Sequence, residues 1–255
     1  MEHQPLVVAL VADTHCTRGT DEDKPMYRGR FEKAIGAVND AQVDVVLIAG
    51  DLTSGMRSEQ IHDFQQLVRE FEAPAFFVPG NHDVGDKVLP DKAGVTSARV
   101  ARYEKELGPS YWVEQVGWVR IIGLNSSLFA SGLPEEEQQW TFLEDLLESD
   151  NRVPTVLLMH HPPFSKNLLE PGGVYWNIEP APRMRLLNMA QNAGVKAILS
   201  GHLHYSVDFH LGDIQYVTAP PVSFGLPRGK RPQGWTLFTI YPDGNVVYEN
   251  QVIDD

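Results

Sequence analysis

Residues 6–15 read Leu-Val-Val-Ala-Leu-Val-Ala-Asp-Thr-His, an apolar run that ends on two side chains able to bind a metal ion. A short run rich in valine and leucine predicts a strand of a sheet that is covered on both faces. The run falls well short of the roughly 20 apolar residues of a membrane helix. It also lacks the preceding basic stretch of a signal peptide. We therefore expect a strand with Asp13 and His15 at its carboxyl end.

The same kind of apolar run recurs along the chain and alternates with amphipathic stretches, which predicts an α/β fold. The predicted strands are residues 6–12, 44–49, 75–78, 153–159 and 195–199. The predicted helices are residues 28–39, 58–71, 96–107, 135–149 and 182–193. Pro134 and the three glutamates after it mark a helix start, because proline suits the first turn and acids complement the helix dipole.

Three further pairs of apolar segments predict hairpins, the first of them within a second sheet. The pairs are 111–113 with 118–122 around Val116-Gly117, 207–211 with 214–218 around Gly212-Asp213, and 235–241 with 246–249 around Asp243-Gly244. Glycine and aspartate suit such turns. We therefore expect one domain over residues 1–255, a four-layer α-β-β-α sandwich in which two mixed sheets pack face to face with helices outside. Residues 164–181 and 221–234 are rich in proline and glycine and predict long loops.

Composition limits the partners that we expect. The 255 residues include 34 acidic and 21 basic side chains, a formal net charge of −13. Such a charge repels polyanions, so we expect no nucleic-acid polymer as a partner. Cys16 is the only cysteine and cannot form an internal disulfide, which fits a reducing compartment. We expect a soluble, cytoplasmic protein without a membrane partner, in which Cys16 is a small buried side chain with no catalytic role.

Five clusters of metal-binding side chains stand where predicted strands end. They are Asp13-Thr14-His15, Gly50-Asp51, Gly80-Asn81-His82-Asp83, His160-His161 and Gly201-His202-Leu203-His204. Ligands of open α/β sheets gather at the carboxyl ends of strands, so the five clusters can meet in one crevice. Imidazole, carboxylate and amide ligands without thiolate suit Mn, Fe, Zn or Co at a catalytic site. We expect the glycines in these clusters to permit unusual backbone angles at sharp turns.

In this order the clusters resemble the calcineurin-like metallophosphoesterase superfamily, whose pattern D-x-H, GD, GNH(D/E), H, GHxH is matched between residues 13 and 204. The resemblance implies hydrolysis of phosphate esters by a hydroxide that bridges two divalent metal ions, with Mn or Fe favoured. It assigns the first ion to Asp13, His15, Asp51 and His204. It assigns the second ion to Asp51, Asn81, His160 and His202. It also implies that His82 binds the phosphate or protonates the leaving oxygen, and that Asp83 orients His82.

The adjacent histidines 160 and 161 point to opposite sides of a strand, so only one of them faces the site. The resemblance selects His160. A further question concerns the basic cluster of Arg228, Lys230 and Arg231, which either binds a second phosphate or solubilises an exposed loop. Tyr175, Trp176 and Phe224 either stack on a substrate base or pack their own loops. The sequence leaves both questions and the oligomeric state open.

Two substrate classes also stay open. The spacing looks like that of the cyclic-nucleotide or glycerophosphodiester branch, which implies a small-molecule phosphodiesterase, and this is our first expectation. The segments 80–85, 124–126 and 201–204 also look like a eukaryote-type branch, which implies a phosphomonoesterase such as a protein Ser/Thr phosphatase. A scaffold role is disfavoured because every ligand is present, and a nuclease because the chain is acidic. A purple acid phosphatase is disfavoured because residues 50–54 lack the tyrosine ligand of that family.

Overall fold

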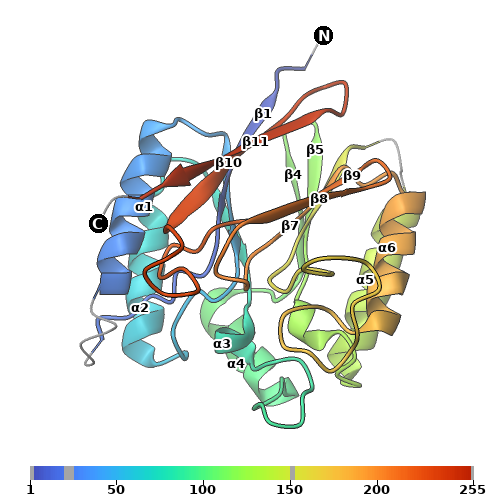
Figure 1. Ribbon diagram of the computed structural model, residues 1–255, viewed down its shortest axis with the longest axis horizontal. Helices are drawn as coiled ribbons and strands as arrows, with labels where there is room; N and C mark the ends of the chain where they lie inside the picture. The colour runs from blue at the N-terminus through green and yellow to red at the C-terminus, as the bar shows by residue number, and fades with distance from the viewer. Residues whose placement is uncertain (1–2, 20–25, 150–152, 254–255) are drawn as a thin grey trace.

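The computed structural model describes residues 3–19, 26–149 and 153–253 (Figure 1). Its strands are β1 Leu6–Val11, β2 Val45–Ala49, β3 Ala75–Val78, β4 Trp112–Val116, β5 Val119–Gly123, β6 Thr155–Leu158, β7 Ala197–Ser200, β8 Val207–Leu211, β9 Ile214–Thr218, β10 Gly234–Ile240 and β11 Val246–Val252. Its α-helices are α1 Met26–Asp40, α2 Ser58–Leu67, α3 Asn81–Val84, α4 Ser97–Leu107, α5 Pro134–Ser149 and α6 Pro180–Asn192. Two 3-10 helices are η1 Val68–Glu70 and η2 Ser126–Leu128.

The strands form two mixed sheets. The five-stranded sheet has the order β11-β10-β1-β2-β3, and the six-stranded sheet has the order β4-β5-β6-β7-β9-β8. Strands β1, β2 and β3 run parallel to one another, as do β5, β6, β7 and β9. The remaining pairings are antiparallel. Parallel neighbours end at the same edge of their sheet, so each sheet presents several strand ends side by side.

Three apolar layers hold the sandwich together. The central layer lies between the sheets and includes Leu10 and Leu47 from one sheet and Ile121 and Leu199 from the other. A second layer packs α1, α2 and α4 against the five-stranded sheet, and a third packs α5 and α6 against the six-stranded sheet. Figure 1 shows α1 and α2 on one flank of the molecule and α5 and α6 on the other. The predicted four-layer arrangement is confirmed.

The elements differ from the predicted ones at three places. The first hairpin turns at Gly117-Trp118, one residue later than predicted, because Gly117 takes φ +58° and Trp118 donates its indole hydrogen to the Gln4 carbonyl at 2.9 Å. The predicted helix 58–71 stops being α-helical at Leu67 and continues as η1, a tightening that is common at helix ends. The short helix α3 was not predicted.

Among the described residues, no helix is long and apolar enough to cross a membrane. The cytoplasmic location and the extent of a single domain stay predictions.

Candidate metal centre

The predicted clusters meet between the two sheets rather than at the edge of one. Asp13, Asp51 and Asn81 follow β1, β2 and β3 of the five-stranded sheet. His160 and His202 follow β6 and β7 of the six-stranded sheet. Both sets lie at the carboxyl ends of parallel strands, where open α/β sheets place their ligands. The face-to-face packing of the sheets therefore brings side chains from both into one site.

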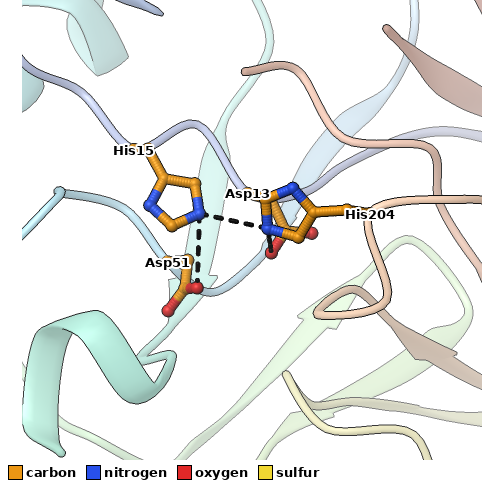
Figure 2. Close-up of side chains that lie close together, drawn as sticks. All are labelled: Asp13, His15, Asp51 and His204. Carbon is orange, nitrogen blue, oxygen red and sulfur yellow. Dashed lines mark hydrogen bonds and ion pairs between the residues drawn. The ribbon is translucent and has the colours of Figure 1, made fainter. Parts of the chain in front are cut away.

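One group of side chains could hold a metal ion. Asp13, His15, Asp51 and His204 are buried and each offers a ligand atom within 4.8 Å of the others (Figure 2). The Nε2 atoms of His15 and His204 are 3.3 Å apart. The Nε2 atom of His15 lies 3.4 Å from Asp51 Oδ2, and that of His204 lies 3.5 Å from Asp13 Oδ1. Two carboxylates and two imidazoles thus face a common point.

A second group adjoins the first through Asp51. The Nε2 atom of His160 lies 3.4 Å from Asp51 Oδ1 and 3.0 Å from Asn81 Oδ1. It also lies 3.1 Å from Nδ1 of His202. Asp51 therefore directs one carboxylate oxygen to each group, which is the geometry of a bridging carboxylate.

Main-chain carbonyls determine which ring nitrogen faces the centre. The pairs are His160 Nδ1 with Ala49 at 2.8 Å, His202 Nε2 with Tyr175 at 3.0 Å and His204 Nδ1 with Phe224 at 2.6 Å. A carbonyl oxygen only accepts, so each of these nitrogens carries a hydrogen. The other nitrogen of each ring then faces the centre.

Nε2 of His160 and Nδ1 of His202 face each other at 3.1 Å. Burial lowers the pKa of His160, but the Asp51 and Asp13 carboxylates outweigh it and raise this pKa to about 9, so the site favours a cation at this point, either a proton or a metal ion. Burial lowers the pKa of His15 and of His202 well below the usual value, so these two rings hold lone pairs rather than protons at neutral pH. Burial alone would raise the pKa of Asp51, but His160 and His82 outweigh it and keep this carboxyl ionised. Neutral imidazoles, ionised carboxylate and an amide oxygen fit divalent metal ions.

Five of these residues hold an uncommon backbone conformation. The φ angles are 53° at Asp13, 44° at His15, 49° at Asp51, 73° at His202 and 57° at His204. A side chain in this left-handed region costs of order 1–3 kcal/mol and persists where the surrounding fold enforces it. The strain turns the chain sharply after each strand and directs the side chain into the site.

The glycines before these residues serve two different purposes. We expected an unusual backbone conformation at Gly50, Gly80 and Gly201. Only Gly50 has one, with a left-handed φ of +81°. A Cβ on Gly80 would lie 2.2 Å from the main-chain nitrogen of Asp51. A Cβ on Gly201 would lie 2.8 Å from Asp13 Oδ2. The expectation was therefore wrong for Gly80 and Gly201, which are small because another segment of the site packs against them.

The expected orientation of His82 by Asp83 is not what the structure shows. The buried Asp83 carboxylate accepts hydrogen bonds from the amides of Leu52, Thr53 and Gly80 at 2.9–3.0 Å. Nδ1 of His82 instead lies 3.1 Å from the Ser54 carbonyl. Asp83 is used by main-chain amides because α3 turns its side chain back beneath the loop. It thereby fixes the loop that carries Asp51.

The neighbouring histidines lie in different environments. His160 belongs to the second group, whereas Nδ1 of His161 lies 2.9 Å from the Ser126 hydroxyl and its Nε2 lies 3.7 Å from Asp86. Burial lowers the pKa of His161 to about 4, so its ring is neutral. Strand alternation does not separate the rings, because both residues follow the end of β6 at Leu158 and their ring centroids are 5.1 Å apart. The contacts of His160 with Asp51 and Asn81 favour it as the ligand.

Two long loops, residues 164–181 and 221–234, cover the site. The ring of Tyr175 lies 4.6 Å from that of His202, and the ring of Phe224 lies 4.2 Å from that of His204. Lys92 lies over Tyr175 at 4.4 Å and Arg228 over Phe224 at 4.2 Å. The loops also supply the Tyr175 and Phe224 carbonyls described above. Sequence reasoning missed that role, because a main-chain oxygen leaves no signature in the residue type.

The sequence profile of calcineurin-like phosphoesterases matches residues 6–206. The chain belongs to the calcineurin-like phosphoesterase family. This phosphoesterase is 32% identical to "Serine/threonine-protein phosphatase CPPED1" of Danio rerio, over 94% of this chain and 78% of that protein. It is 24% identical to a "Probable cyclic nucleotide phosphodiesterase" of Synechococcus, over 85% of this chain and 79% of that protein.

The fold of the phosphoesterase is also similar to a solved structure. The crystal structure of a dimetal phosphatase from Danio rerio superposes with a TM-score of 0.71 at 11% identity, covering 98% of this chain and 97% of that one. The family and the metal-binding cluster together make the chain a metal-dependent phosphoester hydrolase of the dimetal type.

Proposed function

We propose that the two groups hold the two ions of this dimetal hydrolase, with Asp51 shared between them. The first ion is assigned to Asp13, His15, Asp51 and His204, and the second to Asp51, Asn81, His160 and His202. The observation that carries the assignment is the position of Asp51 between the two groups, with Oδ2 3.4 Å from Nε2 of His15 and Oδ1 3.4 Å from Nε2 of His160. Nitrogen and oxygen ligands without thiolate suit Mn, Fe, Zn or Co, and the family resemblance favours Mn or Fe among them.

Two divalent ions in such a site polarise the phosphoryl oxygens and make water a better nucleophile at neutral pH. The protein contributes the position of each ligand through the carbonyls of Ala49, Tyr175 and Phe224. It also contributes His82, which is exposed at the rim of the site. The nearby Asp51 carboxylate raises the pKa of His82, so a proton is available there. We assign His82 to phosphate binding or to protonation of the leaving oxygen.

Phosphomonoesters are the substrate class that we favour, with phosphorylated serine or threonine as the physiological form. The Danio rerio relative named as a serine/threonine-protein phosphatase supports this choice because the similarity extends along 94% of the chain. Two basic side chains lie over aromatic rings of the two covering loops, Lys92 from the segment between α3 and α4 and Arg228 from the loop of Phe224. They also favour a dianionic monoester over a monoanionic diester.

A small-molecule phosphodiesterase is the second candidate. The Synechococcus relative named as a probable cyclic nucleotide phosphodiesterase supports it. So do the partly buried rings of Tyr175 and Phe224 beside the centre, because a nucleotide base stacks on such rings.

Turnover of p-nitrophenyl phosphate and of bis(p-nitrophenyl) phosphate separates the candidates. We expect metal-stripped protein that has been reloaded with Mn²⁺ to hydrolyse the monoester faster, and a phosphoserine peptide to compete with it. Asp51→Ala should lose metal and activity because both groups lose an oxygen ligand. Preference for the diester would favour the second candidate, and equal turnover by Asp51→Ala would contradict the assignment of the bridging residue.

A further inference from the structure

Tyr175 touches two members of the second group through different atoms. Its main-chain carbonyl accepts a hydrogen bond from Nε2 of His202 at 3.0 Å. Its phenol oxygen lies 3.2 Å from Nδ2 of Asn81. The side chain is partly exposed, so it stands between the buried ligands and the solvent from which a substrate arrives.

The direction of the hydrogen bond between Asn81 and Tyr175 follows from the position of the other polar atom of the same side-chain amide, Oδ1. Oδ1 of Asn81 lies 3.0 Å from Nε2 of His160, on the metal side. The amide nitrogen therefore points outward, and an amide nitrogen only donates. The Tyr175 oxygen must accept this bond, so its own hydrogen is left for another acceptor. Within residues 3–19, 26–149 and 153–253, no hydrogen bond takes it up.

The phenol also keeps its hydrogen at neutral pH. The ordinary pKa of a tyrosine phenol is about 10, so the group is neutral at pH 7. The ammonium group of Lys92 lies over the ring, 4.4 Å from its centre, and holds the ring in place. A fixed, protonated donor at the edge of an anion-binding centre costs little reorganisation when an anion arrives.

We propose that Tyr175 is a substrate-binding residue whose phenol donates a hydrogen bond to a non-bridging oxygen of the phosphoryl group. The inference rests on the proposed phosphoester hydrolysis and adds a protein donor that is not a metal ligand. The hydrogen bond strengthens as negative charge grows on the phosphoryl oxygens, so it contributes to turnover and to the binding of inorganic phosphate, the product.

Tyr175→Phe tests the proposal because it removes only the hydroxyl and keeps both the ring and the main-chain carbonyl on His202. Tyr241→Phe is the matched control, since it removes the same hydroxyl from an exposed tyrosine that follows β10 at the end of the sheet opposite to the site. Bound metal is measured first in each variant. We then expect kcat on p-nitrophenyl phosphate to fall on the order of 10²-fold in Tyr175→Phe, and inhibition by inorganic phosphate to weaken at least severalfold. Tyr241→Phe should change neither.

The outcomes separate this inference from the proposed function. Suppose that the wild type turns over the substrate and that metal-replete Tyr175→Phe has the same kcat and the same inhibition by phosphate. This result would overturn the role of Tyr175 and leave the proposed hydrolase function intact. Loss of metal from Tyr175→Phe would also overturn it, because the hydroxyl would then serve to position Asn81. Absence of turnover in the wild type on every phosphoester would instead contradict the proposed function.

Discussion

At the scale of the residue, the proposed ligands depend on backbone that few side chains tolerate. Asp51 has a left-handed φ of 49°, and its Oδ1 accepts a hydrogen bond from the His82 amide at 2.9 Å. Gly80 approaches it so closely that no side chain fits between them. The position of one carboxylate is thus set by three different segments.

Gly80→Ala should therefore displace Asp51. The new Cβ would lie 2.2 Å from both the main-chain nitrogen and Oδ1 of Asp51, so one of the two segments must move. We expect loss of bound metal and a fall in the free energy of unfolding of about 1–3 kcal/mol, measured by metal analysis and chemical denaturation.

Gly36→Ala is the control for that substitution, because Gly36 lies inside α1 with nothing within 4 Å of an added Cβ. Alanine should stabilise the helix there by up to about 1 kcal/mol. Full metal content in Gly80→Ala would contradict the close-approach explanation.

His82→Ala should leave both ions bound and slow turnover, because we place His82 beside the substrate rather than among the ligands. A general acid contributes about 10²–10⁴-fold to the rate, which steady-state kinetics on p-nitrophenyl phosphate would measure. The control is His62→Ala, at an exposed histidine of α2. A rate equal to that of the control would remove His82 from the mechanism.

At the scale of the element, the loop between β6 and α6 is held by one buried carboxylate. Glu170 accepts hydrogen bonds from the amides of Ser165 and Lys166 at 3.0 and 2.5 Å and from Nδ2 of Asn177 at 2.8 Å. Its partners stand before and after Glu170 in the chain. The carboxylate thereby closes the loop that presents Tyr175 to the centre.

Glu170→Gln should destabilise the protein in a pH-dependent way. Burial raises the pKa of Glu170, but the hydrogen bonds from Ser165, Asn177 and Lys166 outweigh it and hold the pKa below the usual 4.5. A lowered pKa in the folded state adds stability above the usual pKa and loses it as the pH falls through the folded value. We expect the variant to be less stable than the wild type by about 1–3 kcal/mol at pH 7.

This difference in the free energy of unfolding should shrink as the pH falls below the usual pKa of 4.5, because both side chains are then neutral. Urea denaturation of the two proteins at several pH values measures it. Glu249→Gln, at an exposed position of β11, should show no such trend. A constant difference across the range would mean that the charge of Glu170 does not hold the loop.

At the scale of the whole molecule, the centre joins the two sheets. The five-stranded sheet contributes the two carboxylates, the amide and the imidazole of His15, whereas the six-stranded sheet contributes the other three imidazoles. A bound ion would therefore stabilise the packing of the sheets in addition to its chemical role. Such binding to the folded state raises the free energy of unfolding by about 2.7 kcal/mol when the free metal concentration is 100 times the dissociation constant.

Removal of metal should accordingly lower the thermal midpoint of unfolding, and Mn²⁺ should restore it. Differential scanning calorimetry of chelator-treated and reloaded protein measures the shift. Asp51→Ala should respond much less to either treatment, since it lacks the shared ligand. An unchanged midpoint in the wild type would mean that the ions do not link the sheets.

Much of this architecture follows from local patterns. Apolar runs and turn residues located all eleven strands of the structure and five of its helices, because burial and turn chemistry act over a few residues. The missed helix α3 spans four residues, from Asn81 to Val84, too few to produce a periodic pattern. The seven proposed ligands were also identified before the structure, by their order and their place after strands.

The sequence by itself therefore determined the class of fold, the candidate ligands and the acidic character of the chain, since these depend on residue type and spacing. Only the tertiary structure decided what lies next to each ligand. It placed the ligands between two sheets, assigned Asp83 to main-chain amides and brought the Tyr175 and Phe224 carbonyls onto the imidazoles. The reason is physical: main-chain oxygens are the same in every residue, and contacts between distant segments depend on how whole sheets and loops pack.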